Sequence, residues 1–175
     1  VQGLIDELNI SSEKQLKVIR AIDKLDKPGF GLSGVEALLK KERKDSSGAI
    51  TKGADLNDDQ VKQILDFLKI KDLKELKDKL INPLSQEGIK ELEDVFEILG
   101  FGKYKDQVQT NFTIVRGLAY YDGFIVETNL NFEVKNNKGK PVDIGSICSG
   151  GAYAKLISRF KGVDIPGTGI SFGVD

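Results

Sequence analysis

The stretch Arg116-Gly117-Leu118-Ala119-Tyr120-Tyr121-Asp122-Gly123 marks the boundary between two differently built halves of this chain. Before it, leucine and isoleucine recur at helical spacing among many Lys and Glu residues; after it, the sequence is β-branched, aromatic and rich in glycine. The glycines let the backbone bend or a ligand approach closely, and the arginine offers a rigid fork of donors for phosphate or carboxylate. The stretch therefore fits a small-molecule pocket, or an ordinary strand and turn with one surface arginine.

On the C-terminal side of this stretch, the pattern predicts an antiparallel sheet. Near-alternation of Val, Phe, Ile and Thr over residues 108–115 predicts a strand, and apolar residues occupy even positions over 124–134. The run Asn136-Asn137-Lys138-Gly139 is typical of a hairpin turn, so a return strand is expected after it. The expected strands are 110–116, 124–134, 142–148 and 168–174, with a short helix over 153–160.

On the N-terminal side, residues 1–105 predict a small all-helical unit. Ser12 with Gln15, and Asn57 with Gln60, have the spacing of a capping box, and Ser85 is the expected cap of the last helix. Residues 45–56 are rich in small and polar residues and are expected to form a loop. The expected helical regions are 1–28, a short helix from Ser33 to Lys44, then 57–68, 72–80 and 85–100. Periodicity alone thus establishes an α+β chain.

The amino-acid composition limits the classes of function that this protein can have. The formal net charge of −1 over 175 residues argues against a general attraction to nucleic acid, although a local basic face is possible. The single cysteine allows no internal disulfide, which fits a reducing cytoplasm, and no apolar run approaches the length of a membrane span. The chain has no histidine, so a His general base is excluded and no protein-bound metal is expected. It begins at Val1 and contains no methionine, which either removal of an initiator methionine or excision from a longer protein would explain; of the two, we favour excision.

Three motifs, in order along the chain, resemble those of the histidyl-tRNA synthetase family. Residues 116–123 resemble its Arg-Gly-Leu-Asp-Tyr-Tyr signature followed by Gly. Residues 148–156, Cys-Ser-Gly-Gly-Ala-Tyr-Ala-Lys-Leu, resemble Gly-Gly-Arg-Tyr-Asp-x-Leu, and residues 167–175 resemble the strand that opens motif 3 of class II synthetases. The upstream run of residues 21–27, Ala-Ile-Asp-Lys-Leu-Asp-Lys, is also similar to this family, so the resemblance spans most of the chain.

This resemblance implies a fold and a set of partners. Residues 1–105 would be the family's helical insertion domain, which reaches the acceptor arm of the tRNA, and residues 106–175 the C-terminal part of the antiparallel-sheet catalytic domain. The family joins histidine to ATP, which brings Mg²⁺, and passes the histidyl group to tRNA(His); the parent would be a cytoplasmic homodimer. Candidate tRNA-phosphate contacts are Lys40, Lys41, Arg43 and Lys44.

The resemblance also assigns site residues. Arg116 would be the catalytic cation that stabilises negative charge on the α-phosphate, and would also contact histidine and ATP. A histidine ring needs one partner for each nitrogen, and a tyrosine hydroxyl can donate or accept. The implied histidine-binding residues are Arg116, Tyr120, Tyr121, Tyr153, Gly150 and Gly151, and the implied adenylate-binding residues are Arg116, Gly169 and Gly173. Because strand residues alternate in direction, one of Tyr120 and Tyr121 is expected to enter the pocket.

The sequence departs from the family pattern at several points. Ala119 stands where the first signature has Asp, and Ala152 and Ala154 stand where the second has Arg and Asp. Motif 1, motif 2 and the first histidine-recognition loop do not occur, and the motif 3 arginine would lie beyond Asp175. The chain by itself therefore holds part of an active site and is expected to be inactive in isolation.

Two other functions stay open at this point. One is a synthetase-like regulatory or histidine-sensing protein without ligase activity. Ala152 and Ala154 favour it, whereas Arg116 and the tyrosine pair, Tyr120 and Tyr121, oppose it. The other is a helical interaction or RNA-binding module with an incidental β tail, which the three ordered motifs oppose.

Overall fold

The computed structural model describes residues 1–44, 48–102, 104–115, 121–153, 158 and 160–173, and it divides the chain into two compact units. The first unit is Val1–Val115 and the second is Arg116–Asp175, so the division falls later than the boundary at 105 expected from the sequence. Residues 106–115 belong with the helices because Phe112 packs against their core and Val115 is buried.

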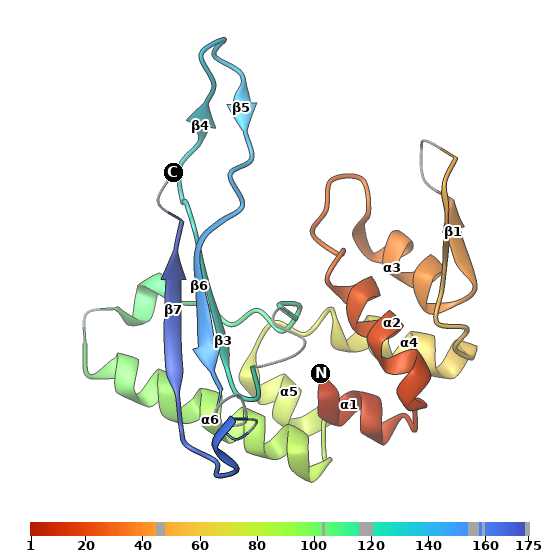
Figure 1. Ribbon diagram of the computed structural model, residues 1–175, viewed down its shortest axis with the longest axis horizontal. Helices are drawn as coiled ribbons and strands as arrows, with labels where there is room; N and C mark the ends of the chain where they lie inside the picture. Colours follow the sequence, from red (N-terminus) through yellow and green to blue (C-terminus); the bar gives the residue numbers. More distant parts are fainter. Residues whose placement is uncertain (45–47, 103, 116–120, 154–157, 159, 174–175) are drawn as a thin grey trace. The chain divides into compact units, whose positions relative to one another are not determined.

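The first unit is built mainly of helices (Figure 1). Helix α2 packs against α3, α3 against α4, and both α1 and α5 against α6. The core is formed by the apolar stripes of these helices, and its most deeply buried side chains include Ile22, Leu39 and Ile64. The elements are α1 Gln2–Glu7, α2 Ser12–Ile22, α3 Gly31–Leu39, β1 Glu42–Lys44, β2 Ile50–Lys52, α4 Asp58–Phe67, α5 Leu73–Lys79, α6 Pro83–Gly100 and η1 Lys105–Gln107.

Of the three helix caps expected from the sequence, one is confirmed and two are wrong. At α4 the expected capping box is present, with the Asn57 side chain accepting from the Gln60 N–H at 2.9 Å. At α2 the expectation is wrong: the N-cap is Ser11, without a side-chain bond, and the Gln15 amide instead donates to the Ile10 carbonyl. At α6 the helix begins before Ser85, because Asn82 caps it and proline is favoured at the first helical position.

The first unit is not all-helical, because residues expected to be a loop form part of a hairpin. Strands β1 and β2 pair antiparallel, with Glu42 opposite Lys52 and Lys44 opposite Ile50. The strands are three residues long, and β1 is wholly charged, so neither carries the apolar alternation that identifies strands in a sequence. After the hairpin, the chain returns along the end of α3, where Ala54 N–H donates to the Leu38 carbonyl at 2.8 Å.

The strand expected within residues 108–116 is also absent from the residues described there. Asn111 Oδ1 accepts hydrogen bonds from both the backbone N–H and the hydroxyl of Thr113, which folds the chain into a local turn. The Thr110 hydroxyl donates to the Lys71 carbonyl at 3.0 Å, holding the segment beside the helices. Local side-chain bonds and packing therefore override the strand propensity.

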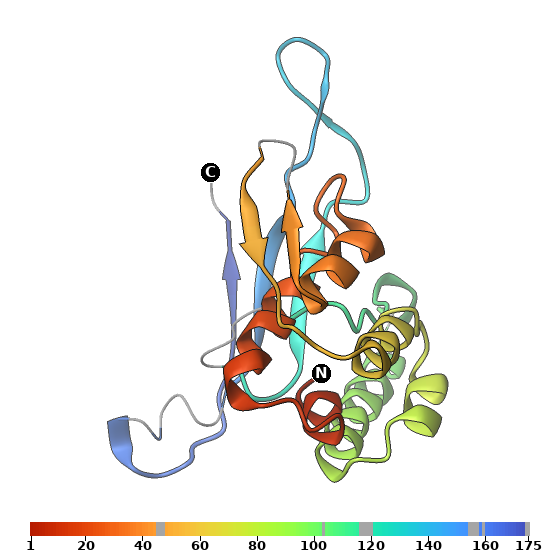
Figure 2. The same cartoon turned by 90° about the vertical axis from the view of Figure 1, so that its right-hand side faces the viewer.

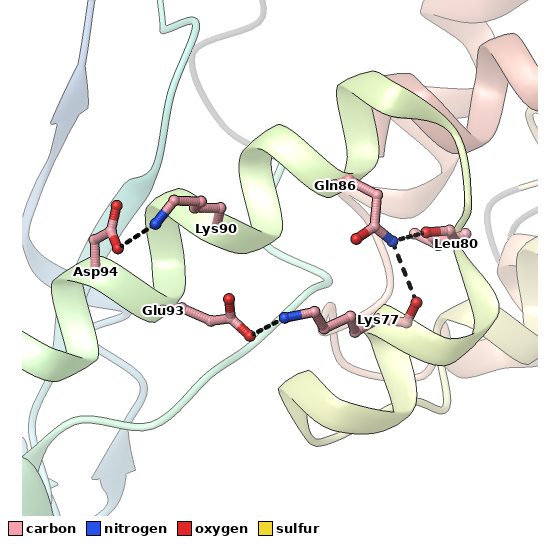
Figure 3. A network of polar contacts seen from close by, with 6 residues as sticks. All are labelled: Lys77, Leu80, Gln86, Lys90, Glu93 and Asp94. Carbon is pink, nitrogen blue, oxygen red and sulfur yellow. Dashed lines mark hydrogen bonds and ion pairs between the residues drawn. The ribbon is translucent and has the colours of Figure 1, made fainter.

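Polar contacts join α5 to α6 (Figure 3). The Gln86 amide donates to the carbonyls of Lys77 and Leu80, which would otherwise lack partners at the end of α5. The Lys77 ammonium lies 2.7 Å from a Glu93 carboxylate oxygen, and Lys90 pairs with Asp94 on the same helix. The Gln86 and Lys77 contacts hold the two helices side by side.

The second unit holds an antiparallel sheet with strand order β3-β6-β7 and a separate two-stranded pair, β4 with β5 (Figures 1 and 2). In the register, Ile125 lies opposite Gly151, which lies opposite Gly169. Backbone bonds from Asp122 to Ala152, and from Ala152 to Phe124, continue the pairing beyond β3. The strands are β3 Ile125–Asn129, β4 Val134–Lys135, β5 Pro141–Val142, β6 Ser146–Ala152 and β7 Thr168–Phe172.

The expected pairing is confirmed, but its long strands are broken. The turn after Asn136 forms as predicted: Asn136 Oδ1 accepts from the N–H groups of Lys138 and Lys140, and Gly139 has φ +73°. The return strand is interrupted because Gly145 has φ +68° and donates its N–H to Asp143 Oδ1. The helix expected over 153–160 lies largely outside the described residues. Within the part of the chain that is described, no helix has the length and apolarity needed to span a membrane.

Candidate functional site

Two tyrosines of the second unit come together beside the three-stranded sheet. The ring centroids of Tyr121 and Tyr153 lie 6.4 Å apart, with the ring planes tilted by 50°. This separation is within the range of directly contacting aromatic pairs. Tyr121 precedes β3, Tyr153 follows β6, and the pairing of β3 with β6 brings these two ends together. Arg116 and Tyr120 lie outside the described residues.

The glycines predicted to leave room for a ligand lie against the tyrosine rings or the neighbouring strand. A methyl group placed on Gly151 would lie 2.9 Å from Cδ1 of Tyr121, and one on Gly169 would lie 2.7 Å from Oη of Tyr153. A methyl group on Gly150 would meet the carbonyl oxygen of Gly169, so Gly150 allows close approach of β7. The space over Gly151 and Gly169 is therefore occupied by the protein's own rings.

Gly173 differs from these glycines. A methyl group there would lie 3.5 Å from the Ile147 carbonyl oxygen, which is ordinary van der Waals contact. Neither tyrosine is among its neighbours within 4 Å.

A row of polar side chains that the sequence pattern did not indicate lies on the same face of the sheet. Glu127 lies opposite Ser149, and Ser149 opposite Ser171, two register pairs along from the row of Ile125 and the two glycines. Residues two apart on a strand point to the same face, so this row shares its face with Gly151 and Gly169. Glu127 and Ser149 are half-buried. The alternation from residue 125 to 127 could have indicated Glu127, had the register been known.

The predicted basic cluster does not act as four equivalent charges. Lys40 lies 3.1 Å from a Glu36 oxygen and 3.2 Å from an Asp58 oxygen. The hydrogen bond to Glu36, together with the neighbouring Asp58, raises the pKa of the Lys40 ammonium. Arg43 lies over the Phe30 ring, with its guanidinium carbon 4.2 Å from the ring centroid. Lys40 and Arg43 therefore have structural partners.

Lys41 and Lys44 are exposed beside and within the hairpin. Lys44 pairs with Ile50 across the hairpin. Because side chains alternate along a strand, Lys44 lies on the same face as Glu42, and Arg43 points to the other face. The register adds Lys52, which lies opposite Glu42 and which sequence spacing alone did not connect with the cluster. We call Lys41, Lys44 and Lys52 the hairpin lysines.

In the part of the chain that the structure describes, hollows lie beside α3 and α4. They are open grooves of about 270 and 530 Å³, and both are bordered by Lys40 and Asp58. Their charged linings differ from the apolar, enclosed pockets that small ligands prefer, so we assign them no ligand. Among the described residues, no three His, Cys, Asp or Glu side chains gather closely enough to hold a metal ion.

These features define a mixed α+β protein with a candidate small-molecule site on an antiparallel sheet. The family profile described as Histidyl-tRNA synthetase matches residues 1–175, and the chain belongs to this family. It is 77% identical over 175 residues to a protein named Histidine--tRNA ligase from Pelagibacter ubique (strain HTCC1062), covering 100% of this chain and 38% of that protein. It is 42% identical over 170 residues to the protein of the same name from Bartonella quintana (strain Toulouse), covering 93% of this chain and 34% of that protein.

A solved structure agrees in fold. The crystal structure of histidyl-tRNA synthetase from Nostoc sp. PCC 7120 superimposes with a TM-score of 0.74 at 31% identity, covering 98% of this chain and 37% of that one. The chain thus spans 38% of the length of the Pelagibacter relative and 37% of the Nostoc structure.

Proposed function

We propose that this chain is part of a histidine–tRNA ligase that activates histidine with ATP and transfers it to tRNA(His). The observation that carries the proposal is the tyrosine pair, Tyr121 with Tyr153, held against the sheet in a member of the histidyl-tRNA synthetase family. Residues 1–115 correspond in this proposal to the helical insertion domain, and residues 116–175 to the C-terminal part of a class II catalytic sheet.

The tyrosine geometry favours one way of recognising histidine. Carbon atoms in contact lie about 3.5–4.0 Å apart, so a ring sandwiched between two others needs about 7 Å or more between them. The Tyr121 and Tyr153 centroids are 6.4 Å apart, which leaves no room for an imidazole between the rings. The histidine side chain would therefore meet phenol hydroxyls at its edge, where each can donate to or accept from a ring nitrogen. Such a site rejects amino acids that lack these nitrogens.

Arg116 is the proposed catalytic cation. Negative charge on the α-phosphate grows in the transition state of histidyl-adenylate formation, and a fixed guanidinium beside it lowers the barrier. ATP would bring its own Mg²⁺. In the family pattern the parent acts as a cytoplasmic homodimer.

Pyrophosphate exchange tests this proposal. Because the chain spans 38% of its Pelagibacter relative, the assay uses that ligase with its matching segment replaced by residues 1–175. Arg116→Ala should slow exchange on the order of a hundredfold to a thousandfold. Tyr153→Phe should instead raise the KM for histidine and leave the KM for ATP unchanged. Near-normal exchange by the Arg116 variant would remove its catalytic role. Histidine binding without any exchange in the unsubstituted chimera would favour the regulatory alternative.

The hairpin lysines are the proposed tRNA contacts of the first unit. Exposed Lys41 and Lys44 can pair with phosphates and release counterions, so their contribution should weaken as salt rises. Replacing both with alanine in the same chimera should raise the KM for tRNA, reduce its salt dependence and leave pyrophosphate exchange unchanged. Lys90→Ala, which removes another exposed lysine on α6, is the control. An unchanged KM for tRNA in the double variant would show that the hairpin does not touch RNA.

A further inference from the structure

We propose that Gly169 is a positioning residue for Tyr153: its missing side chain leaves the space in which the Tyr153 phenol is held for histidine recognition. This replaces the assignment of Gly169 to the adenine of ATP. The inference rests on the proposed function, because it concerns how the histidine site is shaped.

The contacts around Gly169 are the first support. A methyl group on Gly169 would lie 2.7 Å from Oη of Tyr153, 3.2 Å from its Cε1 and 3.4 Å from its Cζ. These three nearest atoms all belong to the Tyr153 side chain, and none belongs to the backbone. The phenol thus fills the position that a side chain at 169 would take, and an adenine ring cannot occupy it as well.

The remaining contacts show that Tyr153 is held along its length. Its backbone N–H donates to the Gly167 carbonyl at 2.8 Å, which fixes the base of the side chain. A methyl group on Gly167 would lie 2.7 Å from Cε2, so the ring runs along the segment from Gly167 to Gly169. On another side the Tyr121 ring is in contact range. With these neighbours, the hydroxyl has few alternative positions.

Gly151 has a related place under Tyr121, but it is a poorer site for a test. A methyl group there would lie 2.6 Å from the carbonyl oxygen of Phe124 as well as 2.9 Å from the Tyr121 ring. A substitution would therefore disturb the pairing of β3 with β6 and not the ring alone. A methyl group on Gly169 has only Tyr153 side-chain atoms as its three nearest neighbours, so a substitution there tests the ring position apart from the strand pairing.

A side chain at 169 should displace the Tyr153 hydroxyl. Moving from 2.7 Å to the 3.4 Å at which ordinary contact begins requires a shift of about 0.7 Å. Hydrogen bonds of a hydroxyl group have donor–acceptor distances of about 2.5–3.0 Å, so a shift of this size takes the hydroxyl out of bonding range. Losing one such bond in the site corresponds to a loss of about tenfold in affinity. Gly169→Ala should thus raise the KM for histidine about tenfold and leave the KM for ATP unchanged.

The deciding experiment is a double-mutant cycle in the Pelagibacter chimera. Gly169→Ala is measured with Tyr153 present and in the Tyr153→Phe background, by pyrophosphate exchange at varied histidine and at varied ATP. Removing Oη removes the 2.7 Å clash, so Gly169→Ala should change the KM for histidine by less than about twofold in the Phe background. Gly88→Ala, at an exposed position on α6 with no atom within 4 Å of the added methyl, controls for the Gly→Ala change itself.

Each result decides something different. An equal rise in the KM for ATP in both backgrounds would overturn the inference and return Gly169 to the adenine site. So would a Gly169→Ala variant that unfolds in both backgrounds, because the glycine would then serve the backbone. If Tyr153→Phe raises the KM for histidine but Gly169→Ala does not, the inference fails while the proposed function stands. If Tyr153→Phe has no effect, or the chimera shows no exchange, the proposed function itself is contradicted, and the inference that rests on it is contradicted too.

Discussion

The two units differ in how far their apolar side chains are buried. In the helical unit, Ile22 and Ile64 are 1% and 0% exposed, and apart from Cys148 every buried hydrophobic residue in the described part of the chain lies within residues 1–115. In the sheet unit, Ile170 is 55% and Phe172 66% exposed. A helix can bury an apolar stripe against another helix of the same unit, whereas a single sheet leaves one face uncovered unless another layer packs on it.

This difference indicates where stability resides. Burial of the helical stripes supplies the first unit with its own hydrophobic core. In the described part of the sheet unit, strand pairing and the tyrosine contact are the main interactions, and few apolar side chains are buried. The far-UV circular dichroism of the helices and the hydrogen-exchange protection of the sheet should therefore respond to different substitutions.

Ile64→Ala should have the largest effect on stability. It removes a fully buried side chain of α4 and leaves a cavity, which typically costs about 2–5 kcal/mol. Urea unfolding of the 175-residue chain measures the loss, followed by far-UV circular dichroism for the helices of the first unit and by amide hydrogen exchange for the strands of the second. Ile170→Ala on β7 is the matched control and should cost much less. Equal losses of stability in the two variants would contradict the expectation that apolar burial stabilises the first unit more than the second.

Asn57→Ala should have an intermediate effect, about 1 kcal/mol, because it removes the side chain that caps α4. Ser11→Ala is its control: Ser11 caps α2 without a side-chain hydrogen bond, so its loss should be a few tenths of a kcal/mol. The same urea titration compares them. If both variants lose the same stability, the cap geometry does not explain helix stability here.

The contact between Arg43 and Phe30 should contribute less, about 0.5–1 kcal/mol at this partly exposed position. The measurement is a double-mutant cycle with Arg43→Gln and Phe30→Leu, read as the free energy of unfolding. A coupling energy near zero would leave Arg43 available as a fourth tRNA-facing charge, as the sequence pattern alone suggested.

Phe172→Ser should have the smallest effect on stability, within about 0.5 kcal/mol, because the ring is already exposed. The substitution should reduce self-association of the isolated chain, since exposed apolar surface promotes contact between molecules. Thermal unfolding and light scattering measure the two quantities. A loss of several kcal/mol would show that the sheet face is covered in solution.

Short-range chemistry made parts of the fold predictable. The capping box at Asn57 and the turn at Asn136 with Gly139 rest on side-chain bonds within a few residues, so the sequence contains all the partners. The same kind of bond made one prediction fail, because the Asn111 turn competes with the strand pattern over 108–115. The β1–β2 hairpin was missed because its strands carry no apolar alternation.

Periodicity and motifs were enough to predict the mixed α+β class, the apolar stripes of the helices and the tyrosines of the candidate site. Which residues those tyrosines touch depends on how the strands pair. Strand pairing puts Gly169 beneath Tyr153 and Glu127 on the same sheet face as Gly151, although these residues lie far apart in the chain. Register is a long-range property: a shift by one residue would turn every side chain of a strand to the other face, and local propensity carries no information about it.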